Sequence, residues 1–261
     1  MLTRIYAPAE CHILRWGTAF IFLIVWEVAI EVGWIPELFT SSPTRIFKAA
    51  MEVFKEGTIW KDMWISAKEF FMGFAFSIVT GVPLGILMGW YRRPRLMGSL
   101  FVSFFYAMPR VAMLPLLILW FGIGLYSKIA LVFLGAFFPI LISTCSGIQN
   151  LDESLIKCAR SFGANDWQLF RDIALPASVP FILIGCNLGI GRALIGVVVG
   201  ELYGATAGVG FFIANAGSLY QTDRVFVGII IVSVAGVLLI ELMNLIESRF
   251  QRWRPELQQR G

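Results

Sequence analysis

Long apolar runs separated by shorter polar connections dominate the chain, and they predict six membrane-spanning helices. Each run can cross a hydrocarbon core of roughly 30 Å at about 1.5 Å per residue. The first continues past Glu27 to Trp34 without a small-x-small cleavage site, so we expect a retained helix rather than a signal peptide. The fold class expected is all-α and polytopic, with spans at residues 17–35, 70–90, 96–121, 129–148, 177–203 and 225–246.

Basic residues are distributed unevenly between the connections, and this sets the expected orientation. If six helices alternate, one side receives the N-terminus, the second and fourth connections and the tail, with Arg4, Arg15, Arg92, Arg93, Arg95, Lys157, Arg160, Arg171, Arg249, Arg252, Arg254 and Arg260. The two later connections on the other side hold only Lys128 and Arg224. We therefore expect both termini to be cytoplasmic, with a segment 1–16, one transmembrane domain 17–248 and a basic tail 249–261.

Composition agrees with a membrane protein and argues against site chemistry. The chain is 58% hydrophobic and 15% charged, whereas soluble domains are about half apolar and a quarter charged. The net charge of +4 comes without a dense basic tract, so no nucleic-acid partner is expected. The one histidine and four scattered cysteines predict neither a metal site nor a catalytic site.

The first connection, residues 36–69, is long and has a helical pattern. Ser42 and Pro43 read as a helix start, and Ile46, Ala49 and Val53 then recur at helical spacing opposite charged residues. Acids such as Asp62 and Glu69 balance its lysines. We expect an amphipathic helix on the periplasmic face, either an ordinary surface helix or a surface for a partner.

Two spans carry features that predict their packing. Pro109 and Pro115 interrupt the third span, which is therefore kinked, broken or shared by two short helices. Gly81, Gly85 and Gly89 form a stripe of small residues on the second span, which is typical of close helix packing.

The connection 149–176 is the longest polar segment expected on the cytoplasmic side. Asp152 precedes an apolar stripe at helical spacing, and Gly163 reads as a helix stop. A second stripe follows from Trp167 and runs to Leu175-Pro176, which we expect to end this second short helix. The pattern predicts two short helices hinged at Gly163, with small residues that allow close approach to another surface.

This connection resembles the "EAA" cytoplasmic loop of ABC importer permeases. The matching positions are Ala159, Gly163, Ile173, Leu175 and Pro176, whereas Lys157 and Cys158 stand where that pattern has Glu and Ala. Stretches 108–124 and 200–213 are similar to the nitrate/sulfonate/taurine/bicarbonate branch, as is Ala159-Arg160-Ser161-Phe162-Gly163-Ala164. The resemblance runs in order from about residue 36 to residue 250.

The resemblance implies a type I ABC importer permease in a bacterial inner membrane. Such a chain forms the translocation pathway, usually as a homodimer, and is not itself an enzyme. Two ATPase subunits would bind ATP and Mg²⁺, so no cofactor is expected here, and a periplasmic or lipid-anchored binding protein would deliver the solute. The loop would then form the coupling helix that contacts the ATPase, through Ala159, Arg160, Gly163, Ala164, Ile173, Leu175 and Pro176.

Polar and charged residues inside the spans are the candidate pathway residues, because such groups usually face protein or a water-filled cavity. They are Arg110, Arg192, Asn187 and Glu201. Our hypothesis is that the two arginines favour a small anion such as a sulfonate, bicarbonate or an aromatic acid. The alternative is that each pairs with an acid on a neighbouring helix for assembly. Glu201 either gates the pathway or braces the turn between Gly204 and Gly210.

Two other function classes are weighed against a transport subunit. A self-contained secondary transporter of a small organic anion often carries broken helices in both halves, whereas only the third span is interrupted here. An intramembrane enzyme needs paired acids or histidines at catalytic spacing, which the spans lack.

Overall fold

The computed structural model describes residues 8–34 and 40–251, and these form helices and connecting turns without a strand. Residues 1–7 of the predicted N-terminal segment, residues 35–39 and residues 252–261 of the predicted basic tail lie outside the described residues. The expected all-α class is confirmed.

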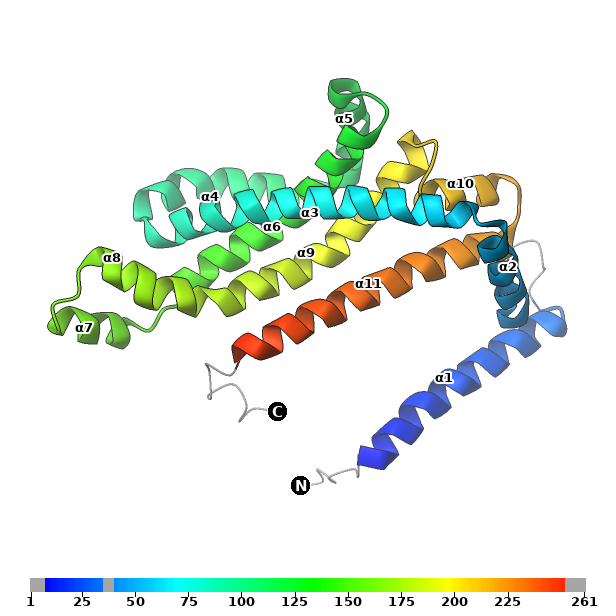
Figure 1. The fold of residues 1–261 in the computed structure, drawn as a ribbon, viewed down its shortest axis with the longest axis horizontal. Helices are drawn as coiled ribbons and strands as arrows, with labels where there is room; N and C mark the ends of the chain where they lie inside the picture. Colours follow the sequence, from blue (N-terminus) through cyan, green and yellow to red (C-terminus); the bar gives the residue numbers. More distant parts are fainter. Residues whose placement is uncertain (1–7, 35–39, 252–261) are drawn as a thin grey trace.

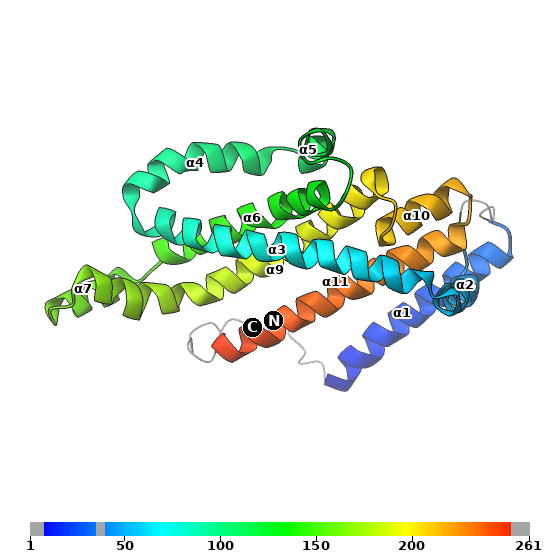
Figure 2. The same cartoon turned by 45° about the horizontal axis from the view of Figure 1, so that its top comes forward.

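A bundle of long helices forms the body of the molecule. In Figures 1 and 2, α3, α6 and α9 run side by side, and α11 lies along α9. Helices α7 and α8 lie at one end of this bundle, and α2 and α10 lie at the other. The elements are α1 (Pro8–Glu31), α2 (Pro43–Glu56), α3 (Thr58–Trp90), α4 (Arg92–Ala107), the 3-10 turn η1 (Arg110–Met113), α5 (Leu114–Phe121), α6 (Leu125–Gln149), α7 (Glu153–Ser161), α8 (Asp166–Gln168), the π-helical η2 (Leu169–Ala174), α9 (Leu175–Gly204), α10 (Val209–Ser218) and α11 (Thr222–Gln251).

Five of the predicted spans have a counterpart among the described helices that are long and apolar enough to cross a membrane. Four are continuous, and the fifth is the pair 92–107 and 110–121, which is bent by 89°. The third predicted span is therefore broken rather than kinked, and Figure 1 shows α5 projecting away from the bundle. The first predicted span overlaps the continuous helix α1, which ends at Glu31, and its crossing of the membrane stays a prediction.

Two predicted boundaries are wrong. Helix α3 begins at Thr58 rather than at residue 70, and within the added stretch Asp62 and Glu69 contact other helices, as described below, whereas Lys61 and Lys68 are exposed. Leu175-Pro176 does not end a short helix, since the chain is helical without a break from Asp166 to Gly204. A π-helical turn precedes Pro176 and lets the helix continue through the proline. In this turn the Leu175 N–H donates to the Phe170 carbonyl, five residues back, instead of to a carbonyl four residues back as in an α-helix.

The predicted amphipathic helix is confirmed as α2. The Ser42 hydroxyl accepts a hydrogen bond from the Arg45 N–H, and Pro43 occupies the first turn. Its predicted apolar face is buried, with Ile46 and Val53 packed beside Ile59 of α3 and Val227 of α11. This end of the bundle is thus a packed layer and not a loose loop.

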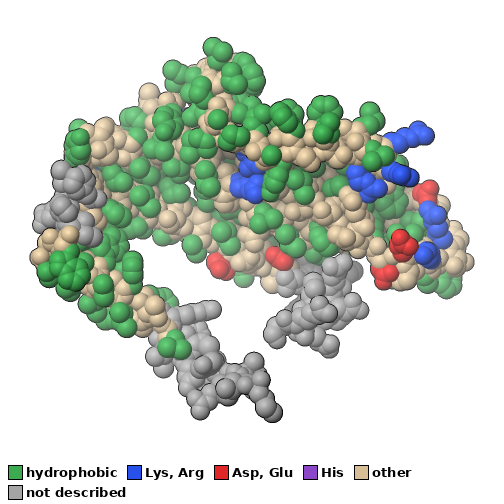
Figure 3. All heavy atoms as spheres, turned by 180° about the vertical axis from the view of Figure 1, so that it is seen from behind, with side chains coloured by type: hydrophobic (Ala, Val, Ile, Leu, Met, Phe, Trp, Pro, Cys, Tyr) green, Lys and Arg blue, Asp and Glu red, His purple; other side chains and the backbone are tan. Residues whose placement is uncertain are grey.

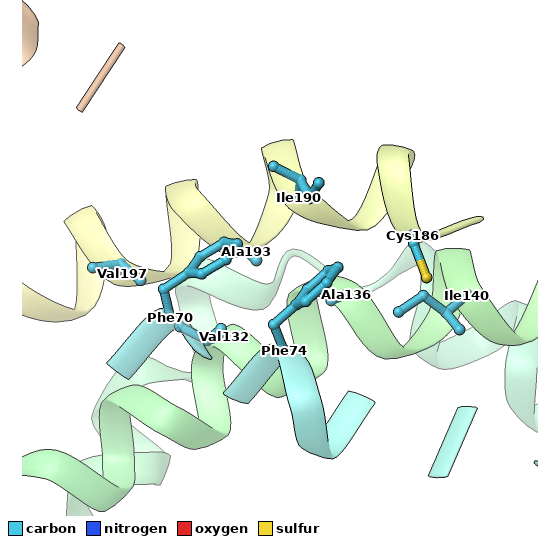
Figure 4. Packing of buried hydrophobic residues seen from close by; sticks show 9 residues of the cluster. All are labelled: Phe70, Phe74, Val132, Ala136, Ile140, Cys186, Ile190, Ala193 and Val197. Atoms are coloured by element: carbon cyan, nitrogen blue, oxygen red, sulfur yellow. The ribbon is translucent and has the colours of Figure 1, made fainter. Parts of the chain in front are cut away.

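The main core lies between α3, α6 and α9. Figure 4 shows Phe70 and Phe74 of α3 directed toward the other two helices. The two rings stack with centroids 5.3 Å apart. Small residues let the backbones approach, and a cluster of buried side chains fills the centre, comprising Phe70, Phe74, Val132, Ala136, Ile140, Cys186, Ile190, Ala193 and Val197.

The predicted glycine stripe packs against α6, as expected. A Cβ at Gly85 would lie 2.7 Å from both the Leu141 carbonyl oxygen and the Thr144 Cβ. We expect Gly85→Val to destabilise the protein by about 1–3 kcal/mol, because it forces α3 and α6 apart. Thermal unfolding in detergent measures this, with Gly191→Val as the control because no atom lies within 4 Å of its Cβ position. Equal melting temperatures for the two variants would contradict this account of the stripe.

Candidate functional site

The two intramembrane arginines lie together where the third span breaks. Arg110 is the first residue of η1, and Arg192 lies midway along α9. Both approach Tyr106 near the end of α4, with guanidinium carbons 5.5 Å and 4.7 Å from the ring centroid, respectively. Arg192 Nη2 donates to the Tyr106 hydroxyl at 2.7 Å, and Arg110 Nη2 donates to the Tyr106 carbonyl at 3.3 Å. We call this cluster the arginine pocket.

The arginine pocket carries positive charge that no acid neutralises within the described part of the chain. No carboxylate there forms an ion pair with either guanidinium, so the alternative of pairing within the protomer is not found. Arg110 Nε is buried and has no hydrogen-bond partner there. A cavity of about 300 Å³ adjoins both, lined by Tyr106, Met108, Pro109, Arg110, Val111, Leu131, Gly135, Arg192, Ile195 and Gly196. Figure 3 shows basic side chains amid hydrophobic ones in the middle of one face.

The other two predicted pathway residues lie elsewhere. Asn187 Nδ2 donates to Asn244 Oδ1 of α11 at 3.2 Å, so this amide joins two helices. Glu201 is fully buried at the end of α9, away from Arg192 as its spacing predicts. Of the four predicted residues, only Arg110 and Arg192 therefore lie together, whereas Asn187 and Glu201 each lie elsewhere.

Glu201 and two residues of α3 together hold the N-terminus of α10. Asp62 Oδ1 accepts from the Gly208 N–H at 2.9 Å, and the Ser66 hydroxyl accepts from the Val209 N–H at 2.9 Å. Glu201 accepts from the Gly210 N–H at 2.7 Å and from the Ser66 hydroxyl at 2.6 Å. Negative groups suit a helix N-terminus, whose first N–H groups lack intrahelical partners. This geometry supports the bracing role of Glu201, since a Cβ at Gly208 or Gly210 would collide with its side chain.

A buried ion pair lies at the same end, and sequence analysis missed it. Lys128 of α6 contacts Glu69 of α3, with side-chain exposures of 6% and 1%. The Lys128 stem packs against α9, because a Cβ at Gly200 would lie 3.1 Å from Lys128 Cγ. From the sequence, Glu69 is expected in the first connection and Lys128 in a later one, whereas the structure places them within helices α3 and α6. The signal for their burial in the sequence is that each directly precedes a long apolar run, which begins at Phe70 and at Ile129, respectively. We call Glu69, Lys128 and Glu201 the charged triad.

The predicted coupling loop is built around a left-handed turn. Helix α7 is capped by Asp152, whose carboxylate accepts from the Ser154 N–H at 2.8 Å. Hydrogen bonds with the side chain and the backbone N–H of Ser154 lower the pKa of Asp152. Gly163 has φ +84°, and the Ala164 N–H donates to the Ala159 carbonyl at 3.1 Å. This is the helix-ending arrangement that favours glycine.

Around Gly163 the space is open, with no atom within 4 Å of its Cβ position. Within this chain the glycine is therefore required by its backbone conformation, and the close approach to another surface stays a prediction. Next to it, Phe162 is 87% exposed, an unusual state for a phenylalanine. Arg160 pairs with Asp166 across the turn at 3.1 Å. Of the other predicted loop residues, Ala159 and Ala164 flank the turn, whereas Ile173, Leu175 and Pro176 lie further along, from η2 into α9.

Comparison with known proteins identifies relatives over almost the whole chain. Residues 81–252 match the family described as "Binding-protein-dependent transport system inner membrane component". A putative aliphatic sulfonates transport permease protein of Bacillus subtilis (strain 168) is 35% identical over 90% of this chain and 85% of its own. The taurine transport system permease protein of Escherichia coli (strain K12) is 30% identical over 93% of this chain and 90% of its own.

A solved structure shares the fold. It is an inward-facing conformation of the MetNI methionine ABC transporter, superposed with a TM-score of 0.61 at 22% identity, over 76% of this chain and 96% of that chain. The predicted multi-pass permease and its type I ABC importer fold are confirmed. A transport subunit of this kind works with an ATPase and a substrate-binding protein, and the alternative of a secondary transporter falls away. The chain belongs to the family of binding-protein-dependent transport system inner membrane components.

Proposed function

We propose that this permease forms the pathway for a small organic anion of the sulfonate class. The observation that carries the proposal is the arginine pocket, where two cationic side chains that have no carboxylate partner among the described residues adjoin a cavity. A sulfonate has three acceptor oxygens, which suit guanidinium donors. The names of the relatives, which refer to aliphatic sulfonates and taurine, agree with this chemistry.

The assembly we propose has two copies of this chain, two ATPase subunits and a periplasmic or lipid-anchored binding protein. A two-fold axis would present the arginine pocket twice and so strengthen the positive field along the pathway. The exposed turn at Phe162 and Gly163 would contact an ATPase, which binds ATP and Mg²⁺. The bundle end with α2 and α10 would face the binding protein, and both termini would be cytoplasmic.

The test is ATP-driven uptake of ³⁵S-labelled taurine by proteoliposomes that contain the assembled transporter and its binding protein. We expect Arg110→Gln and Arg192→Gln each to reduce uptake at least about tenfold, because each removes a charge-assisted hydrogen bond to the anion. Arg93→Gln is the matched control, since it removes one positive charge from an exposed position outside the pocket.

The assembly of each variant is checked by co-purification of the ATPase. Normal assembly with lost uptake supports a pathway role for the arginine. Uptake equal to that of the unsubstituted protein for both variants would overturn the proposal, as would lost assembly as their only defect.

A further inference from the structure

Tyr106 makes more contacts in the arginine pocket than its position in the sequence suggests. Its hydroxyl, its ring and its carbonyl all meet a guanidinium group, and both arginines lie near the same ring. No sequence motif singled this residue out. Its side chain is 38% exposed, and it lies one residue before the end of α4. Tyr106, which contacts both arginines, therefore lies where the third span breaks.

Two like charges near one ring need a compensating group. Each guanidinium is attracted to the electron-rich face of a tyrosine, and this attraction strengthens away from bulk water. Within the described residues no carboxylate performs that task here. The Tyr106 ring thus allows Arg110 and Arg192 to stay near each other in the empty pocket.

The Tyr106 hydroxyl has a second effect. It occupies one donor of Arg192, at 2.7 Å. A sulfonate oxygen carries negative charge, whereas the hydroxyl is neutral, so a guanidinium–sulfonate contact adds the attraction between opposite charges to the hydrogen bond. An anion can thus displace the neutral Tyr106 hydroxyl from the Arg192 guanidinium.

We infer that Tyr106 is the positioning residue of the anion site, where its ring holds both guanidinium groups and its hydroxyl occupies the place on Arg192 that the anion takes. This inference rests on the proposed function. It assigns opposite effects to two parts of one side chain. The ring promotes anion binding, whereas the hydroxyl competes with it and so keeps the affinity low enough for release.

The experiment measures the Kd for ³⁵S-labelled taurine on the permease–ATPase complex in nanodiscs, without binding protein, by scintillation proximity. Tyr106→Phe keeps the ring and removes the competing hydroxyl, so we expect the Kd to fall about three- to tenfold. Tyr106→Leu removes both parts, and we expect the Kd to rise at least about tenfold. Tyr126→Phe changes an exposed tyrosine outside the pocket and should leave the Kd unchanged. If Tyr106→Leu does not assemble, Tyr106→Met serves the same purpose.

The outcomes separate this inference from the proposed function. In an Arg192→Gln background, Tyr106→Phe should no longer tighten binding, because the donor it frees is gone. If Arg192→Gln weakens binding but Tyr106→Phe leaves the Kd unchanged or raises it, the inference about Tyr106 is overturned and the proposed function stands. If Arg192→Gln binds like the unsubstituted complex, or if that complex does not bind taurine, the proposed function itself fails.

Discussion

Replacing Lys128 with methionine is expected to destabilise the folded protein by about 3–5 kcal/mol, because it leaves carboxylates buried without their cation. Glu69 and Glu201 are both fully buried, and Lys128 is the one ammonium group that contacts Glu69 among the described residues. Removing one partner of a buried pair costs far more than the pair contributes to stability, because the remaining charge has lost water as well as its counter-ion.

The effect should reach beyond the ion pair. Glu201 also holds the first N–H groups of α10, together with Ser66. A disturbance of the charged triad is therefore expected to loosen the turn between α9 and α10. We expect the melting temperature in detergent to fall by roughly 10 °C, and hydrogen exchange to rise first at residues 208–212.

Two further variants make this prediction specific. The double variant Lys128→Met/Glu69→Gln removes both charges of the pair, and we expect it to recover much of the lost stability. Arg224→Met breaks the partly exposed pair with Glu56 and should cost about 1 kcal/mol or less. If Lys128→Met melts within a few degrees of Arg224→Met, the charged triad does not have the stabilising role described here.

Replacing Gly163 with valine is expected to abolish stable association with the ATPase while leaving the permease folded in the membrane. A β-branched residue strongly disfavours a positive φ, so the turn after α7 must change shape. Phe162 and the end of α7 would then move, and the exposed surface that we propose for the ATPase would be lost. Co-purification of the ATPase with tagged permease measures this.

Gly57 provides a matched control. It has φ +78° and open space around its Cβ position, as Gly163 does, but it lies between α2 and α3 at the other end of the bundle. Gly57→Val therefore introduces similar backbone strain away from the proposed contact. We expect the ATPase to co-purify with Gly57→Val and not with Gly163→Val. If both variants retain the ATPase, the turn at Gly163 is not part of the surface that contacts it.

The parts of the fold that could be predicted from the sequence are those where a local residue pattern is compatible with one local structure. A serine followed by proline and a helical apolar stripe gives α2, and the spaced glycines of α3 can only be useful where another backbone approaches. The turn at Gly163 was also predictable, because glycine tolerates a left-handed conformation that other residues disfavour.

Contacts between distant helices could not be predicted from the sequence. Glu69 and Lys128 looked like ordinary charges beside spans, since a charge next to an apolar run can face water or protein equally well. Tyr106 was missed for the same reason, because only the break after α4 brings it to Arg192, 86 positions along the chain. The proline pair predicted an interruption but not the direction of the 89° bend.

The central claim is that the arginine pocket is accessible and attracts anions, and thiol chemistry tests it directly. Ile195 lines the pocket and is 58% exposed, so Ile195→Cys places a thiol there. Cys11 and Cys158 are first replaced with serine, whereas Cys145 and Cys186 are buried and can stay. Two reagents of similar size then compete for the thiol, 2-sulfonatoethyl methanethiosulfonate and its trimethylammonium counterpart.

The measurement is the ratio of the two modification rates, divided by the same ratio for free mercaptoethanol. We predict that the sulfonate reagent is favoured at least about tenfold, and that Arg192→Gln removes most of this preference. An equal or reversed ratio, or a preference that survives the loss of both arginines, would contradict an anion pathway through this pocket.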